Sequence, residues 1–165
     1  MEAKFVEMKD EHLEKVLDIY NYYVLYTNAT FHSHEMSQDE MRELVFYNNP
    51  KYKTFVIICE DNNITGYVSL KQHKTREAYD DTAEISVYIN KDSVGKGLGG
   101  LSVKYIEDYA KSKGLHVLIA SICGQNETSI KLFSGNGFLK CAHYREVGRK
   151  FDKILDVVAY QKILD

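Results

Sequence analysis

A glycine-rich turn constrains this sequence more than any other feature. Four of the six residues from Gly95 to Gly100 are glycines, and they join an alternating, strand-like run, Thr82–Ile89, to a helical pattern, Leu98–Lys113. Glycines let the backbone approach a phosphate without interference from Cβ atoms, and the first N–H groups of a helix attract negative charge. The sequence therefore predicts a strand–turn–helix unit that binds a pyrophosphate, although a plain tight turn would use the same residues.

Two other phosphate-binding motifs overlap this turn. The dinucleotide pattern GxGxxG is matched by Gly95, Gly97 and Gly100. In that pattern the glycines follow their strand closely and an acidic residue ends the next strand, whereas here Asn90–Val94 intervene and Leu115–Gln125 contain no acid. A Walker A loop needs Ser or Thr after its lysine, but Lys96 is followed by glycine. Both alternatives are therefore disfavoured. A nicotinamide- or flavin-dependent oxidoreductase remains a competing hypothesis.

Hydrophobic periodicity and turn residues predict the order of elements along the chain. Asp10 is expected to cap the first helix, and Ser37 with Glu40 forms a capping box for the second. The expected strands are 4–8, 54–60, 64–71, 82–89, 115–122, 138–147 and 154–163, and the expected helices begin at 11, 38, 98 and 127; the apolar face of the first runs from Leu13 to Val24, and the others end near 47, 113 and 133. Strands mixed with helices and hairpins predict an α/β fold, of the α+β kind with a mixed sheet.

Length and composition limit the classes of protein that need to be considered. A chain of 165 residues with 44% hydrophobic and 27% charged residues is expected to form one domain, residues 1–165. The net charge of −3 disfavours nucleic acid as a partner. We expect no membrane association, because no apolar stretch approaches the roughly 20 residues of a spanning helix, and a cytoplasmic location.

The cysteines and histidines give no pattern of a metal site. Three cysteines, Cys59, Cys123 and Cys141, lack a CxxC pair and a His at zinc-ligand spacing, so structural thiols are expected. Surface or structural roles are likewise expected for the histidines, which are His32, His34, His73 and His143 in the segments of interest. No metal is predicted.

The order of several motifs resembles the GNAT superfamily of N-acetyltransferases, and within it the phosphinothricin and methionine sulfoximine acetyltransferases. The resemblance spans nearly the whole chain. It is carried by Ile19–Asn21, Asn28–Phe31, the run TAEISVYI at Thr82–Ile89, Gly95–Gly99, Asn126 with Ser129, Gly137–Phe138, and Val147–Phe151 with Asp156. It implies a GNAT-type acyl-CoA N-acyltransferase fold, whose central sheet splays beside the strand at Glu84–Ile89 and whose cosubstrate is acetyl-CoA.

The resemblance also implies a set of cosubstrate-binding residues. The pantetheine amides would bond to the backbone of Val87, Tyr88 and Ile89 as an added strand. Asn126 and Ser129 would lie near the pantetheine or the thiol, unless Asn126 only caps its helix. The pyrophosphate would be bound by Gly95, Lys96, Gly97, Leu98, Gly99 and Gly100.

Glu84 is the candidate catalytic base in this scheme. Most primary amines are protonated at pH 7, so the site must accept a proton, directly or through water, before the amine attacks. Backbone N–H groups near Val87–Ile89 would stabilise the developing oxyanion. Two residues depart from the superfamily pattern: Val94 stands where Arg or Gln is common, and Phe133 where related enzymes place a His or Tyr near the departing sulfur. Without the surrounding motif, Glu84 would be taken as an ordinary solvated strand residue.

The acceptor is expected to be a small amino-acid-like amine. Phe31 and the segment Lys74–Tyr79 match positions that border the amino-acid pocket of the family, so Lys74 or Arg76 would pair with a carboxylate or phosphinate and Tyr79 would line the pocket. The basic residues could equally belong to a solvated loop. Alternatives are a protein or peptide N-acetyltransferase and a non-catalytic CoA-binding regulatory module. The resemblance also suggests a homodimer.

Overall fold

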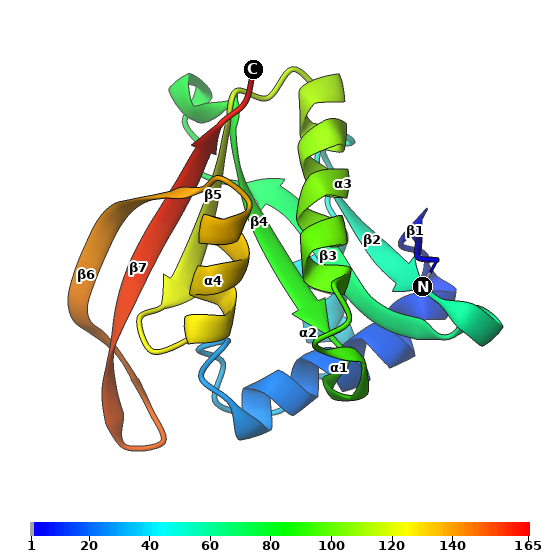
Figure 1. The fold of residues 1–165 in the computed structure, drawn as a ribbon. Helices are drawn as coiled ribbons and strands as arrows, with labels where there is room; N and C mark the ends of the chain where they lie inside the picture. The colour runs from blue at the N-terminus through cyan, green and yellow to red at the C-terminus, as the bar shows by residue number, and fades with distance from the viewer. Residues whose placement is uncertain (1) are drawn as a thin grey trace.

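The computed structural model describes residues 2–165, which form one open sheet with helices on both faces (Figure 1). The sheet has seven strands in the order β1-β2-β3-β4-β5-β7-β6, with β4 and β5 parallel and all other neighbours antiparallel. The strands are β1 (Lys4–Glu7), β2 (Lys53–Ile58), β3 (Ile64–Gln72), β4 (Thr82–Ile89), β5 (Val117–Cys123), β6 (Leu139–Lys150) and β7 (Lys153–Ile163). The predicted mixed α/β class and the predicted order of helices and strands are confirmed.

The first helix is amphipathic, as predicted, but it does not begin at the predicted cap. Helix α1 (Leu13–Tyr26) buries Leu13, Val16 and Tyr20 against the sheet. Asp10 is not its N-cap: a 3-10 turn precedes the helix, and His12 occupies the cap position. The carboxylate of Asp10 pairs instead with the guanidinium of Arg42.

The second helix and the first hairpin follow their sequence signals closely. Helix α2 (Gln38–Val45) opens with the predicted capping box, in which the Glu40 N–H donates to Ser37 Oγ at 3.1 Å and the Ser37 N–H donates to Glu40 Oε2 at 2.9 Å. Strands β2 and β3 are joined by a turn in which Asp61 and Asn62 have positive φ. Short polar side chains tolerate this backbone region, which explains the success of the prediction.

The second half of the chain differs from the prediction mainly at element boundaries. Helix α3 (Leu98–Ser112) is followed by Gly114 at φ 75°, as expected for a left-handed helix end. Strand β5 begins at residue 117 and not at 115, because the Leu115 N–H still bonds to the Ala110 carbonyl of the helix end. Helix α4 (Glu127–Gly135) runs two residues past Phe133, and the β6–β7 hairpin is longer than predicted, with its turn at Phe151 and Asp152.

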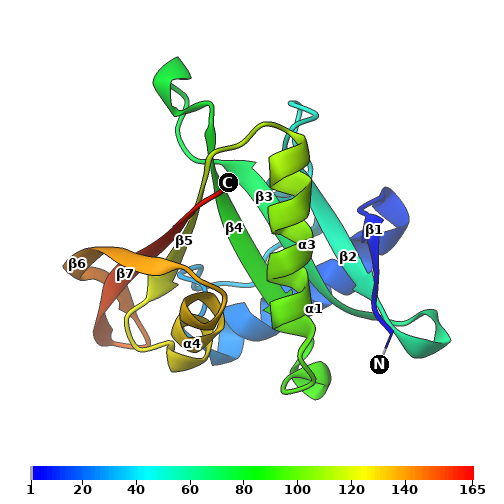
Figure 2. The ribbon, with the colours of Figure 1, turned by 45° about the horizontal axis from the view of Figure 1, so that its top comes forward.

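Two hydrophobic cores lie on the two faces of the sheet. Helices α3 and α4 cover one face and α1 and α2 the other (Figures 1 and 2). The first core joins Val103 and Ile106 of α3 to Leu70 and Ile85, and the second joins Val16 and Met41 to residues including Val56 and Tyr67. Within residues 2–165 no helix has both the length and the apolar character to cross a membrane.

Candidate active site

Strands β4 and β5 separate along their length, and this opens the sheet. Their parallel ladder pairs only Thr82–Glu84 with residues 117–119. The Asn90 N–H donates to the Thr65 carbonyl at 2.7 Å, and hydrogen-bonded pairs alternate along an antiparallel ladder, so the even-numbered residues of β4 bond to β3. The backbone groups of Val87 and Ile89 therefore face β5 beyond the last paired residue, and within the described chain only the Ile89 carbonyl has a recorded partner on that side, the Tyr23 hydroxyl.

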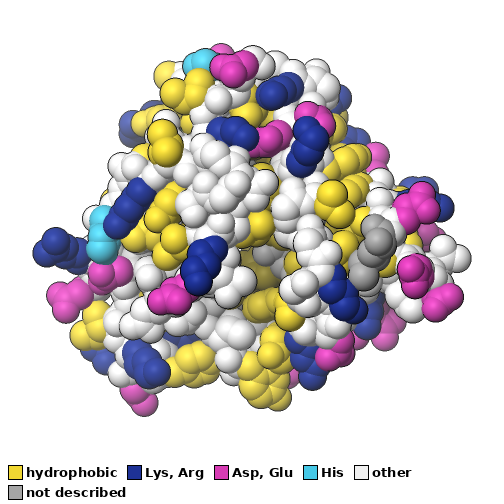
Figure 3. All heavy atoms as spheres, in the orientation of Figure 1, with side chains coloured by type: hydrophobic (Ala, Val, Ile, Leu, Met, Phe, Trp, Pro, Cys, Tyr) yellow, Lys and Arg dark blue, Asp and Glu magenta, His cyan; other side chains and the backbone are white. Residues whose placement is uncertain are grey.

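A cavity of about 570 Å³ occupies the opening between these strands. The space-filling view shows the molecule hollowed between α3 and α4, with hydrophobic side chains at the floor (Figure 3). Most residues predicted to bind the cosubstrate line this cavity. They are Val87, Tyr88, Ile89, Gly95, Gly97, Leu98, Gly99, Gly100, Asn126 and Ser129. Lys96 is the exception, because it lines a separate recess beside Lys15 and Asp92.

The glycine-rich turn presents free backbone donors to one end of the cavity. Gly97 is the N-cap of α3, at φ 82°, and Gly95 has φ 76°. The N–H groups of the first helical turn have no intrahelical partner, and this first turn contains no acidic side chain. Gly99 has a further, structural reason to be glycine, because a Cβ there would lie 3.0 Å from the Leu132 side chain of α4. The turn can bind an anion by its backbone alone.

Asn126 performs the structural role that the sequence left open. Its Oδ1 accepts the Ser129 N–H at 3.2 Å and its Nδ2 donates to Ser129 Oγ at 3.1 Å, so it caps α4 at the cavity wall. Phe133 is buried, lines the same cavity and packs edge-on against Phe138. It offers no proton, and Val94 is exposed at the rim.

A second cavity of about 370 Å³ meets the first at the gap in the sheet. The two share wall residues, which are Ala29, Ile85, Ser86, Tyr88, Ser121 and Ile122. The second cavity lies against α2 and the face of β3 that carries Ser69 and Lys71. Its walls also include Glu84 and Phe31. Phe31 packs on the backbone of Gly148, where a Cβ would come within 2.4 Å of the ring. A molecule in the second cavity can thus reach one in the first.

Glu84 has two partners that the sequence analysis did not assign to the site. His73 Nδ1 lies 2.9 Å from Glu84 Oε2, and Lys71 Nζ lies 3.9 Å from Glu84 Oε1. The Glu84 side chain is 21% exposed. Alternation along β3 was an available signal, because Tyr67, Ser69 and Lys71 share one face, but only the strand register places Lys71 opposite Glu84.

Three residues predicted for acceptor binding do not line either cavity. They are Lys74, Arg76 and Tyr79. Lys74 Nζ lies over the Tyr79 ring, 5.1 Å from its centroid, and this ring packs edge-on against His73. The segment therefore covers the His73–Glu84 pair from outside, and a role in acceptor binding stays a prediction.

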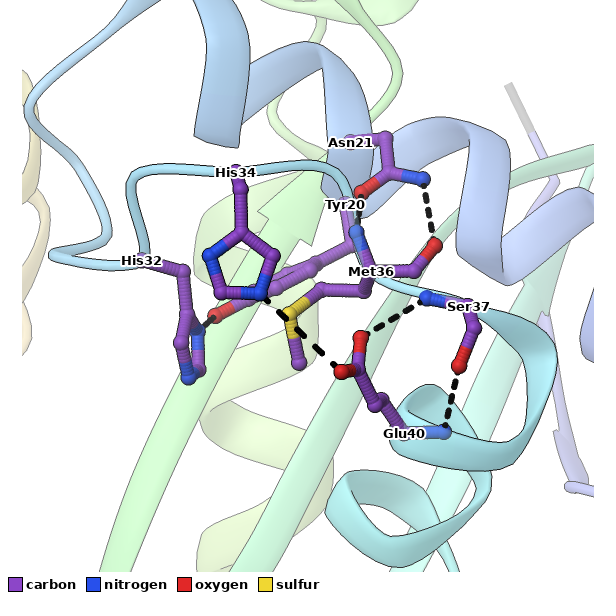
Figure 4. Close-up of polar contacts among 7 residues, drawn as sticks. All are labelled: Tyr20, Asn21, His32, His34, Met36, Ser37 and Glu40. Atoms are coloured by element: carbon purple, nitrogen blue, oxygen red, sulfur yellow. Dashed lines mark hydrogen bonds and ion pairs between the residues drawn. The ribbon is translucent and has the colours of Figure 1, made fainter.

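Tyr20 of α1 and the loop after this helix form a polar cluster that includes residues lining the second cavity; Figure 4 shows Tyr20 and His32 of this cluster. The Tyr20 hydroxyl lies 2.6 Å from Thr30 Oγ1 and 2.5 Å from His32 Nδ1. Burial lowers the pKa of His32, with the neighbouring His34 adding to the effect, so the neutral imidazole is favoured at pH 7. Burial raises the pKa values of Tyr20, Tyr67 and Tyr88 above the ordinary 10, so these wall residues are uncharged phenols.

The fold and the site together define a class: a transferase that binds an extended, phosphate-bearing cosubstrate in a split sheet and a small acceptor beyond it. The sequence profile of the acetyltransferase (GNAT) domain matches residues 5–159. The chain belongs to this family, and it is an N-acetyltransferase that uses acetyl-CoA.

Individual relatives share nearly the full length of the chain. The L-amino acid N-acyltransferase MnaT of Escherichia coli is 34% identical over 91% of this chain and 87% of its own. An L-methionine sulfoximine/L-methionine sulfone acetyltransferase of Salmonella typhimurium is 33% identical over 100% of this chain and 95% of its own. Among solved structures, a phosphinothricin acetyltransferase of Sinorhizobium meliloti in complex with acetyl-CoA superposes with a TM-score of 0.94, at 26% identity over 99% of this chain and 89% of that one.

The residues of this chain fit acetyl-CoA. Pantetheine carries amides that can pair with strand backbone, and β4 presents such groups at Val87 and Ile89 toward the opening. The pyrophosphate needs N–H donors, and the start of α3 supplies them beside Gly95 and Gly97. Among residues 2–165 no group of three His, Cys, Asp or Glu side chains could bind a metal ion.

Proposed function

We propose that the protein transfers the acetyl group of acetyl-CoA directly to the amine of a small amino-acid-like acceptor, of the phosphinothricin or methionine sulfoximine type. One observation carries the proposal: the acceptor-sized cavity meets the cosubstrate cavity at the gap between β4 and β5, and Glu84 stands in its wall. The names of the methionine sulfoximine and phosphinothricin relatives support the same class of acceptor.

In the proposed reaction, acetyl-CoA supplies the activated acetyl group. The acceptor ammonium first gives one proton to the Glu84 carboxylate, directly or through water. The neutral amine then forms the new C–N bond, and the C–S bond breaks to release CoA as a thiolate. The second proton that the nitrogen loses passes through water to this thiolate, and no covalent enzyme intermediate is needed. The free N–H groups of β4 near Val87 and Ile89 are placed to stabilise the oxyanion.

The departing thiolate needs no dedicated acid in this scheme. Phe133 cannot donate a proton, and two of the polar side chains that line the same cavity, Asn126 and Ser129, bond to each other. A thiolate is already a good leaving group, so water suffices to protonate it.

Two other functions remain as competing outcomes. A protein or peptide acceptor would need an open groove, whereas the second cavity is bounded by α2, β3 and the loop that carries Phe31 and His32. A non-catalytic CoA-binding module would be supported by Val94 and Phe133 alone. We favour the small-molecule enzyme because the second cavity is small and Glu84 lines it.

The test is a thiol-release assay with acetyl-CoA and a panel of amines led by methionine sulfoximine and phosphinothricin, with amine-free hydrolysis as the baseline. Thiol release that depends on these amines is the expected result. Acetyl-CoA binding without release across the panel would overturn the proposal in favour of a protein acceptor or a CoA sensor.

We further propose that the protein is a homodimer. The family resemblance suggests it, and the β6–β7 hairpin exposes large apolar side chains that a second copy could cover. These are Leu139, Tyr144, Val147, Phe151, Ile154 and Ile163. Light scattering after size-exclusion chromatography tests the proposal, and a monomer at micromolar concentration would overturn it.

A cytoplasmic location is also proposed. Cys59, Cys123 and Cys141 are free thiols in the structure, which agrees with a reducing compartment. Fractionation of cells that express the protein would test this location.

A further inference from the structure

We propose that Lys71 binds the carboxylate of the acceptor and thereby selects α-amino acids with apolar side chains over simple amines. The inference rests on the proposed function, because it concerns the acceptor cavity of that reaction. It differs from the sequence-based expectation, which placed the acidic group of the acceptor against Lys74 or Arg76.

The first argument is the spacing of opposite charges. Lys71 on β3 is the register partner of Glu84 on β4, and their Nζ and Oε1 atoms are 3.9 Å apart. Both side chains line the second cavity. An α-amino acid carries its ammonium and carboxylate on one carbon atom, which puts the two charges about 3 Å apart by bond geometry. A zwitterion can therefore present its ammonium to Glu84 and its carboxylate to Lys71 together.

The second argument is the hydrogen-bonding capacity left on each group. Glu84 Oε2 already faces His73 Nδ1 at 2.9 Å, so Oε1 is the oxygen that remains for an ammonium. The 3.9 Å contact from Lys71 exceeds hydrogen-bond length. Its ammonium, which has three donors, is about half exposed and records no hydrogen bond within residues 2–165. Lys71 and Glu84 therefore attract each other without forming a direct hydrogen bond, so both can still bind the opposite charges of a zwitterion.

The third argument is the composition of the cavity wall. Among the described residues that line the second cavity, Lys71 is the only lysine or arginine. His32 is also there, but its lowered pKa favours the neutral ring. Lys150, which lies nearby in the fold, is buried and donates to the Thr30 carbonyl at 2.7 Å. An acceptor carboxylate in this cavity therefore meets one available cation.

The fourth argument concerns the acceptor side chain. Part of the wall is apolar or aromatic, and it is formed by Met41, Leu44 and Val45 of α2, Tyr47 after this helix, and Tyr67 of β3. Burial raises the pKa of Tyr47 and of Tyr67, so both phenols are uncharged at pH 7. Such a wall favours a hydrocarbon or thioether group and disfavours a second charge.

The experiment compares two acceptors that differ only in the carboxylate, L-methionine and 3-(methylthio)propylamine, under saturating acetyl-CoA. In Lys71→Met we expect kcat/KM for methionine to fall roughly 10- to 100-fold, chiefly through KM, because a charge-assisted hydrogen bond is lost. The rate with the carboxylate-free amine should change little. Lys71→Arg should recover most of the methionine activity, and Lys104→Met, at an exposed position on α3, controls for loss of one positive charge.

Each outcome decides between the proposals. If the wild type acetylates neither these compounds nor the earlier panel, the proposed function fails and takes this inference with it. If the wild type acetylates methionine and Lys71→Met does so equally well, the proposed function stands and the role of Lys71 is overturned. If Lys74→Met or Arg76→Met alone causes the selective loss, the carboxylate is bound outside the cavity and the inference is wrong.

Discussion

The side chain of Glu84 contacts residues that its neighbours in the sequence do not predict. The run TAEISVYI made Glu84 a candidate base, but its partners come from β3 and from the segment after it. His73 contacts one carboxylate oxygen, the other lies 3.9 Å from Lys71 Nζ, and Glu84 lines the second cavity. A carboxylate held in this way accepts a proton at a defined oxygen, which is what alignment of an amine requires.

Replacing the base should change the pH dependence of the reaction. In Glu84→Gln we expect kcat/KM at neutral pH to fall by roughly 100-fold or more, because general-base catalysis is removed. The two rates should converge as the pH rises toward the pKa of the acceptor amine, where more amine is already neutral. Initial rates across pH, with calorimetric binding of CoA as the control, provide the measurement. Parallel pH profiles, or loss of CoA binding, would contradict the assignment.

At the scale of elements, the glycine-rich turn and the helix that it opens act as one unit. Gly95 and Gly97 have positive φ, and a Cβ at either would meet no atom within 4 Å. Their requirement for glycine is therefore conformational and not steric. Gly99 is different, because the close approach of Leu132 requires its small size. The same sequence motif thus serves both anion binding and helix packing.

A pair of substitutions tests whether the left-handed backbone at Gly97 is needed for CoA binding. Gly97→Ala should reduce the free energy of unfolding by about 1–2 kcal/mol, because an alanine must adopt left-handed backbone angles, and should weaken CoA binding. Gly135→Ala, at the end of α4 and also free of contacts within 4 Å, should leave CoA binding unchanged. Denaturant unfolding and CoA titration of both variants test the pair. Equal CoA affinity in both would contradict a role for the turn.

The contact of β6 with the loop after α1 should make stability depend on pH. Lys150 is buried in β6, and desolvation lowers its pKa below the usual value. The unfolded chain therefore binds the Lys150 proton more readily than the folded chain does. The resulting loss of folding stability is greatest below the pKa that Lys150 has in the folded chain, and it vanishes above the ordinary lysine pKa of about 10.4. Relative to Lys150→Met, the wild type should gain stability as the pH rises from neutral toward the ordinary lysine pKa of about 10.4. Denaturant unfolding across this range tests it, with Lys104→Met as the baseline; a constant difference would contradict it.

Element identity was predictable from the sequence because periodicity, glycines and caps are local signals. The failure at Asp10 has a non-local cause, the ion pair with Arg42, whereas the later start of β5 has a local one, the bond from the Leu115 N–H back to Ala110 at the helix end. Most residues predicted to bind the cosubstrate line one cavity, because they cluster in three segments, and their binding role stays a prediction. The acceptor cavity was not predicted, because Lys71 and His73 join the site only through strand register and the fold of the following loop.

At the scale of the whole molecule, the two halves of the sheet are joined by few bonds at their centre. The three register pairs between β4 and β5 contrast with the seven between β3 and β4 and the seven between β5 and β7. A ligand that bonds to β4 and reaches α3 and α4 therefore supplies contacts that the protein itself lacks in the opening.

Binding of CoA should accordingly stabilise the fold. At 100 times its Kd, CoA should add about 2.7 kcal/mol to the free energy of unfolding, which corresponds to a rise in Tm of roughly 5–10 °C for a chain of this size. NAD at the same concentration should give no such rise, since the dinucleotide motif is only partly matched. Scanning calorimetry with each ligand makes the measurement, and a larger shift with NAD would reverse the assignment.

The opening in the sheet also connects two separate cavities, one for each reactant of the proposed reaction. The first cavity lies beside α3 and α4, where the molecule is hollowed (Figure 3), whereas the second cavity is lined by residues of α2 and β3. Helix α2 lies on the other face of the sheet from α3 and α4 (Figure 1). A separate cavity for each reactant would let the acetylated product leave while CoA is still bound. An excess of acceptor should then not compete with acetyl-CoA. Double-reciprocal rate plots should intersect, which is the pattern of a ternary complex that each reactant enters from its own side of the sheet.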